Sequence, residues 1–138
     1  MKPTTRIRIA MVVQLVAILF SFMTWIDPLE GGVAMALATG ISFFAWAIGR
    51  VPPPKFTWIS AAAGLTIMIA FWVIYISEIP ADPTEVTQFV PSAFLLSMLW
   101  VYRVAAVAFI SGAFFYLVVQ FTALRAGRTP GDSSPAPL

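Results

Sequence analysis

Arg103 is the only basic residue inside the long apolar stretches of this 138-residue chain. A charge within or at the edge of a membrane span is costly, so it marks a candidate functional position. Because Arg103 stands between Trp100 and Tyr102, it can extend to an interface, contact a lipid headgroup or pair with a carboxylate. We predict pairing with Glu78 or Asp82, which follow the preceding apolar stretch on the same side of the membrane.

Two glutamines, Gln14 and Gln120, are the other polar side chains that could form a site. Each lies near the end of an apolar stretch, at a spacing that allows contact between helices. Hydrogen bonding between helices is the simpler interpretation, and lining a polar ligand site is the alternative. The chain has no histidine and no cysteine, which removes the usual general base, the common metal and haem ligands and all thiol chemistry. We therefore predict no enzymatic activity, no metal site and no bound cofactor.

The composition determines the class of protein to which these residues belong. Hydrophobic residues make up 60% of the chain and charged residues 10%, with a mean hydropathy of +0.91. Soluble domains carry about a quarter charged residues, so this chain belongs in a lipid bilayer. Its net charge of +2 is explained by basic loops beside membrane spans, and we expect no nucleic-acid partner.

Four apolar stretches divide the chain into membrane spans. We predict spans over about 9–26, 32–49, 58–79 and 92–124, which together form one transmembrane domain over 1–124. A turn over Asp27–Gly32, a proline-rich connector over Arg50–Lys55 and an acidic loop after Glu78 separate them. Links as short as the first force an antiparallel return. The fold class is therefore an all-α, four-span antiparallel transmembrane bundle with a Pro/Ser-rich tail over 125–138.

The second span carries two rows of small residues at four-residue spacing. Such rows allow two helix backbones to approach closely within a membrane. Packing on another span of the same chain is the first interpretation, and an interface with a second chain is the alternative. The rows are Gly32, Ala36 and Gly40, and Ala34, Ala38 and Ser42.

Charge is divided unequally between the loops. Seven of the eight basic residues lie in the N-terminus, the proline-rich connector and the tail, and five of the six acidic residues lie in the other two loops. The positive-inside rule therefore predicts a multi-pass protein of the cell (inner) membrane with both termini in the cytoplasm.

The fourth apolar stretch is too long for one crossing. From Ser92 to Leu124 it would form a helix of about 50 Å, whereas the hydrocarbon core is about 30 Å thick. If the segment from Arg103 to Arg125 crosses the bilayer, Ser92–Val101 is left without lipid. A kink at Ser111 and Gly112 would absorb part of this length. Otherwise Leu96, Leu99 and Trp100 need protein to cover them.

The surplus apolar segment and the missing chemistry together predict a function. We expect a small non-catalytic accessory subunit of a larger integral membrane complex, of the energy-transducing (respiratory or photosynthetic) kind. Its partners would be the bilayer and other integral membrane subunits. The alternative is a small self-assembling transporter, channel or holin-like pore. Against that alternative, the spans lack the embedded acid or row of arginines that small exporters usually need.

Overall fold

The structure, a computed structural model, describes residues 1–26, 28–82, 84 and 89–127. It confirms an all-helical fold in which α1 (Pro3–Ile26), α2 (Pro28–Gly49), α3 (Lys55–Glu78) and α5 (Ala93–Ala126) are each long and apolar enough to cross a membrane. Residues 128–138 of the predicted tail lie outside the described part of the chain.

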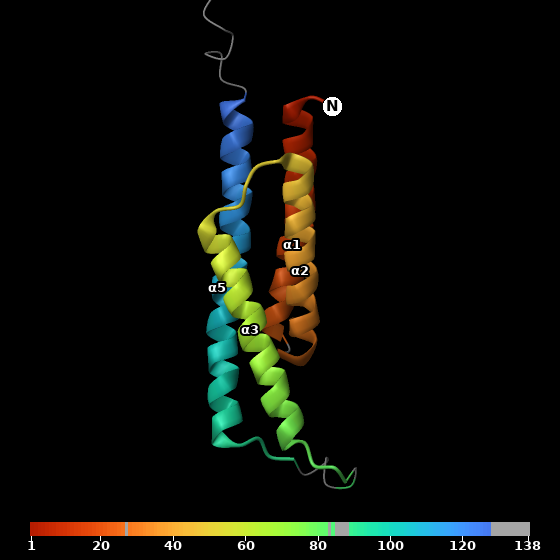
Figure 1. The fold of residues 1–138 in the computed structure, drawn as a ribbon, viewed down its shortest axis with the longest axis vertical. Helices are drawn as coiled ribbons and strands as arrows, with labels where there is room; N and C mark the ends of the chain where they lie inside the picture. The colour runs from red at the N-terminus through yellow and green to blue at the C-terminus, as the bar shows by residue number, and fades with distance from the viewer. Residues whose placement is uncertain (27, 83, 85–88, 128–138) are drawn as a thin grey trace, which may run out of the picture.

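The four helices run alternately up and down the bundle (Figure 1). We call the end that holds the start of α1, the α2–α3 connector and the end of α5 the basic end. The opposite end, with the α1–α2 turn and the connection from α3 to α5, is the acidic end. Basic and acidic loops therefore lie at opposite ends of the molecule, as an antiparallel bundle with an even number of spans requires.

The first turn is much shorter than predicted. We expected Asp27–Gly32 to form a loop, but α2 already begins at Pro28. Proline is favoured at the first position of a helix, and an acidic residue such as Glu30 in the first turn complements the helix dipole. The two glycines serve packing instead, because a Cβ on Gly31 would lie 2.8 Å from the Thr24 carbonyl oxygen, and one on Gly32 would collide with Met68 of α3.

The inward faces of α1 and α5 follow alternating three- and four-residue steps, the spacing of packed antiparallel helices. These faces include small residues, which bring the backbones together, and several polar side chains. On α1 they are Ala10, Gln14, Ala17, Ser21 and Thr24, and on α5 Tyr102, Ala106, Phe109, Ala113, Tyr116 and Gln120.

The two rows of small residues on α2 differ in burial. In the second row Ala34 and Ala38 are buried inside the bundle, which confirms packing within the chain for that row. In the first row Gly32 packs on α3, but Ala36 and Gly40 are exposed, and nothing described lies within 4 Å of a Cβ built on Gly40.

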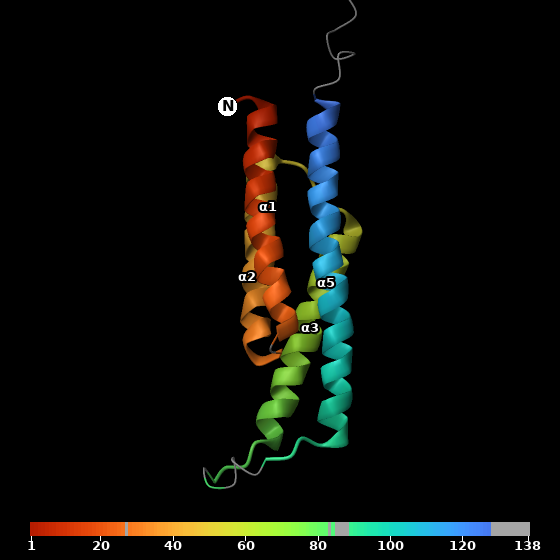
Figure 2. The ribbon, with the colours of Figure 1, turned by 180° about the vertical axis from the view of Figure 1, so that it is seen from behind.

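The two halves of the bundle are displaced along its axis (Figures 1 and 2). Side-chain contacts give the register along α5. Helix α1 lies beside α5 from Thr4, which packs next to Gly127, to Thr24, whose carbonyl accepts a hydrogen bond from Tyr102. Helix α3 lies beside a different part of α5, from Gly112, bonded to Thr57, to Ser92, bonded to Glu78.

This displacement explains the length of α5. Helices α1 and α3 each have 24 residues, which suits one crossing of a bilayer. At the acidic end α1 ends beside Tyr102, whereas α3 ends beside Ser92. These two residues are ten positions apart, so α3 extends about 15 Å further along the bundle than α1. Helix α5 runs beside both and therefore needs its 34 residues in one unbroken helix. The kink that we considered at Ser111 and Gly112 does not interrupt it.

Candidate functional site: a buried polar layer and an arginine between two indoles

A polar layer crosses the bundle toward its basic end. The Thr57 hydroxyl of α3 donates a hydrogen bond of 2.9 Å to the Gly112 carbonyl of α5. The two helices meet closely here, because a Cβ on Gly112 would lie 3.3 Å from the Thr57 Cα and collide with the Ser60 hydroxyl. The Ser60 hydroxyl itself donates to the Thr57 carbonyl. This contact attaches α3 to α5.

Gln14 supports the interpretation that the glutamines join helices. Its side chain is fully buried, and Nε2 donates a hydrogen bond of 3.1 Å to the Ala113 carbonyl on α5. Gln120 is also fully buried near the Tyr116 hydroxyl, but neither of its amide atoms, nor Gln14 Oε1, makes a hydrogen bond of normal geometry within the described residues. The two glutamines therefore lie in the same interface without a bond between them.

Two tyrosines of α5 satisfy backbone carbonyls at opposite ends of the bundle. The Tyr116 hydroxyl donates to the Val51 carbonyl in the proline-rich connector, at 2.8 Å. The Tyr102 hydroxyl donates to the Thr24 carbonyl, at 2.9 Å. Although Tyr102 adjoins Arg103, for which the sequence suggested an interfacial position, the Tyr102 ring is 1% exposed and belongs to the bundle core. The Tyr102 hydroxyl thus joins α5 to α1, and the Tyr116 hydroxyl joins α5 to the connector.

The chemistry of this layer is limited to hydrogen bonding. Its functional groups are amides, hydroxyls and backbone carbonyls, none of which is a good acid or base near neutral pH. Within the described ranges no three His, Cys, Asp or Glu residues lie close enough to hold a metal ion. Hydroxyls on the outward faces, such as those of Thr66, Ser111 and Thr122, donate to carbonyls four residues earlier in their own helices. Such residues are compatible with lipid contact.

Arg103 lies between two tryptophans instead of beside a carboxylate. Its guanidinium carbon is 5.7 Å from the centre of the Trp25 ring on α1 and 5.0 Å from that of Trp100 on α5. Both distances are in the range of cation–π attraction. Among the described residues neither Glu78 nor Asp82, the partners that we predicted, contacts Arg103.

Those two carboxylates have other partners. Glu78 accepts hydrogen bonds from the Ser92 backbone N–H and hydroxyl, which joins the end of α3 to the start of α5. Asp82 accepts from the Thr84 backbone N–H and hydroxyl, at 2.9 and 2.8 Å. These bonds, the backbone one first, hold the pKa of Asp82 below its usual value.

The surplus segment of α5 is partly covered by α3. The ends of α3 and α5 extend past the α1–α2 turn (Figure 2). We define the protruding end as residues 73–78 of α3 and 93–101 of α5, because Trp72 still lies beside Gly32 of α2. Leu95 is buried there, and Leu99 is half-buried. A groove of about 170 Å³ lies between these two helices and the start of α2, lined in part by Leu29, Phe71, Leu96 and Leu99. On the outer surface Phe94 is 61% exposed and Leu96 49%.

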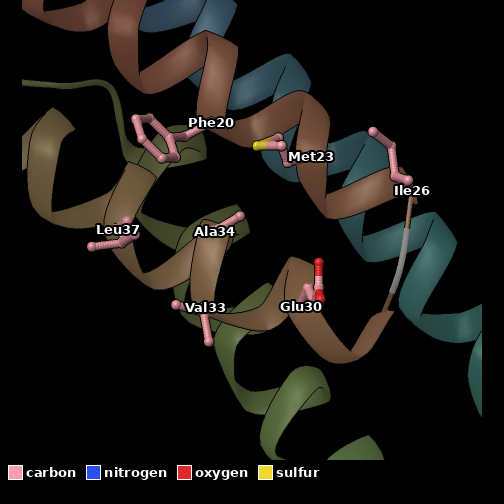
Figure 3. A pocket seen from close by; sticks show the side chains of 7 residues that line it. All are labelled: Phe20, Met23, Ile26, Glu30, Val33, Ala34 and Leu37. Atoms are coloured by element: carbon pink, nitrogen blue, oxygen red, sulfur yellow. The ribbon is translucent and has the colours of Figure 1, made fainter.

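A second groove, of about 370 Å³, lies between α1 and α2 near the acidic end (Figure 3). Its lining is apolar except for the Glu30 carboxylate at one end, so it suits a hydrocarbon chain. The lining residues are Phe20, Met23, Ile26, Glu30, Val33, Ala34 and Leu37.

Comparison with known proteins adds nothing to this geometry: no family model matches the chain, and neither a curated protein nor a solved structure is significantly similar to it.

The sequence prediction brought together some of these residues and missed others. It placed Arg103 with Trp100 and Leu96 with Leu99, but it gave no role to Thr57 and did not place Tyr102 in the bundle core. The glycine at 112 was a usable signal for a close helix contact. Its partner could not be found, because the two residues are 55 positions apart in the chain.

Proposed function

We propose that this chain is a small non-catalytic accessory subunit of a larger integral membrane complex. The observation that carries the proposal is the displacement of α3 against α1 and α2. Because of that displacement, one flat bilayer cannot cover the apolar surface of all four helices, and another protein has to cover the remainder. We include in the proposal that the complex is of the energy-transducing (respiratory or photosynthetic) kind.

The position of the bilayer follows from the cost of burying charge. A hydrocarbon core centred on α3 would enclose Arg103, which lies midway between Ser92 and Gly112, and Glu30 near the α1–α2 turn. A core placed on α1 and α2 would enclose Lys55 and would have Arg8 and Arg103 at its two edges, because Arg103 follows Tyr102, which bonds to Thr24 near the end of α1. Each charge at mid-membrane costs about 2.5–3.5 kcal/mol, and the long lysine side chain can extend to the interface. The bilayer therefore belongs on α1 and α2.

With that position the protruding end lies outside the hydrocarbon. Its outer surface is apolar: Val73 and Ile76 on α3 and Phe94 on α5 are each about 60% exposed. An apolar surface outside the lipid is characteristic of a protein interface. The groove between Phe71 and Leu99 would accept a side chain of the partner subunit.

The test is copurification from native membranes in mild detergent. Replacing Phe94 and Leu96 together by Ala should at least halve the recovery of partner subunits, because both side chains lie on the outer surface of the protruding end. The matched control replaces Leu15 and Leu19, which are exposed on the bilayer segment of α1, and should leave recovery unchanged. A wild-type chain that runs as a monomer and supports its cellular role in that form contradicts the proposal.

A self-assembled pore is the competing proposal, and one observation favours it. Ser97, Ser111 and Thr122 all lie on the outward face of α5, where a ring of copies could place them around a lumen. Their hydroxyls are already bonded to their own helix, which weakens this argument. A ring made of this chain alone in the same purification would favour the pore over the accessory subunit.

We also propose that the basic end faces the cytoplasm, on the strength of the charge distribution. Since the chain has no cysteine, Glu30→Cys and Thr129→Cys each introduce a single thiol without background. An impermeant thiol reagent added to intact cells should label Glu30→Cys and spare Thr129→Cys. The opposite pattern would reverse the orientation.

A further inference from the structure

We propose that Arg103 and the groove beside Trp100 form a binding site for one anionic phospholipid at the acidic end of the bilayer segment. The lipid phosphate would accept hydrogen bonds from Arg103, and an acyl chain would lie in the groove between α3 and α5. This site does not depend on the chain being an accessory subunit.

The first step concerns what the guanidinium can still bind. The indole faces of Trp25 and Trp100 attract its charge but accept none of its in-plane N–H groups. Arginine has five such donors in a planar fork that matches a phosphate. Arg103 is itself partly exposed and lies against two rings that are 48% and 63% exposed, so its guanidinium is positioned in advance and can reach an anion.

The second step concerns the surrounding charge. Arg103 is the only basic residue of the acidic end. Glu78 is bonded to Ser92, which lies eleven residues from Arg103, about 16 Å along α5. That separation is about two Debye lengths at physiological ionic strength, so the carboxylate neither pairs with the guanidinium nor repels an anion from it.

The third step concerns the hydrocarbon part of the ligand. A groove of about 380 Å³ begins at Trp100 and continues toward the basic end past Val104 and Ala108, with Ala63 of α3 on its other side. From Trp100 to Ala108 it covers about 12 Å of helix. Ser60 contributes the only side-chain hydroxyl to its lining, and that group is bonded to the Thr57 carbonyl.

Trp100 joins the two parts of the site, because it contacts Arg103 and also lines the groove. The cation lies beside Trp100, level with the end of α1, where the bilayer interface falls if the bilayer lies on α1 and α2. From there the groove enters the hydrocarbon. Tryptophan side chains are typical of that interface. The α1–α2 groove is similar in size, but the ionisable residue in its lining is a carboxylate, which would repel a phosphate.

The experiment uses the full chain in phosphatidylcholine vesicles that contain a minor fraction of phosphatidylglycerol with brominated acyl chains. Bromine quenches nearby tryptophans, and the reference is the same fraction of brominated phosphatidylcholine. We expect the phosphatidylglycerol to quench more in the wild type. Arg103→Gln should lower this excess quenching by about half or more, because the charge-assisted bonds are lost.

Two further variants separate the parts of the site. Ala108→Leu fills the groove without changing charge and should also lower the excess quenching. Arg125→Gln is the matched control, because Arg125 lies over one aromatic ring, that of Phe121, at the other end of the molecule, and it should leave the excess unchanged. Circular dichroism checks that each variant remains helical.

Several results would overturn the site. Equal quenching by the two brominated lipids in the wild type would do so, as would an unchanged excess in Arg103→Gln. An effect of Arg125→Gln as large as that of Arg103→Gln would show general attraction to basic residues. Arg103→Gln could lower the excess quenching while Ala108→Leu does not. In that case Arg103 binds the headgroup without the groove, and the proposed binding of the acyl chain in the groove is wrong.

Discussion

The α1–α2 hairpin and the α3–α5 pair illustrate two ways of joining antiparallel spans. In the hairpin α2 begins two residues after α1 ends, so the two helices have the same height at the turn. Small residues close the interface, as where a Cβ on Gly49 would meet Ala10. In the α3–α5 pair, hydrogen bonds from Thr57 and from Ser92 attach the two helices at distant points. In the hairpin the short turn determines the relative position of the two helices along the bundle axis. In the α3–α5 pair, contacts between side chains determine it.

The connector between the halves explains their displacement. Arg50 has a left-handed φ of 56°, and its N–H bonds back to the Trp46 carbonyl, so α2 ends abruptly there. The residues from Val51 to Pro54 are not helical, and Pro54 has the dihedral angles of polyproline II. Four residues in that conformation, from Val51 to Pro54, cover about 12 Å. A stiff connector of that length starts α3 well below the end of α2.

The largest effect should come from separating α3 from α5. Gly112→Leu places a bulky side chain against the Thr57 backbone and should lower the free energy of unfolding by about 1–3 kcal/mol or more. Stability can be measured by titration with a denaturing detergent, and a disulfide crosslink between cysteines placed on α3 and α5 reports whether the pair has separated.

Gly40→Leu is the matched control for that substitution. Gly40 is also a helical glycine, but nothing described lies within 4 Å of its Cβ position, so leucine there should change stability little. If the two substitutions destabilise the protein equally, the α3–α5 contact at Gly112 is not what holds α3 in place.

A smaller effect should distinguish the two glutamines of the α1–α5 interface. Gln120→Leu removes a buried amide that makes no hydrogen bond of normal geometry within the described residues and should raise the free energy of unfolding by about 1 kcal/mol. Gln14→Leu loses the bond to the Ala113 carbonyl and should lower it by about 0.6 kcal/mol, the average for hydrogen bonds between membrane helices.

The informative result is which of the two variants, Gln120→Leu or Gln14→Leu, has the larger free energy of unfolding. Unfolding both variants in the same detergent titration measures this difference directly. A loss of stability in Gln120→Leu greater than that in Gln14→Leu would mean that the Gln120 amide is bonded in the membrane, to water or to another molecule.

The sequence predicts what depends on length and hydropathy. The predicted end of the second span at Gly49 agrees with α2, and the spans predicted over 58–79 and 92–124 lie within three residues of α3 and α5 at each end. The start of α2 was wrong, because two glycines that pack against Thr24 and Met68 have the composition of a turn.

The positions of the helices relative to one another along the bundle axis could not be predicted from length and hydropathy. They depend on single contacts between residues 55 to 99 positions apart, such as Thr57 with Gly112 and Gln14 with Ala113. Hydropathy is nearly uniform along each span and therefore contains no information on which residues face each other. For the same reason the partner of Arg103 was sought among carboxylates near in sequence, whereas its contacts are aromatic rings on two helices.

Helix α3 begins near the middle of α1 and α2 rather than at the basic end. The cross-section of the molecule is therefore smaller at the basic end than at the acidic end. With the bilayer on α1 and α2, the leaflet at the basic end contains three helices, because α3 begins only near the level of Gly112. The leaflet at the acidic end contains four. In that proposed position the protein would take up more area in one leaflet than in the other, like a wedge. A membrane that accommodates such a wedge without strain is convex on the side of the acidic end.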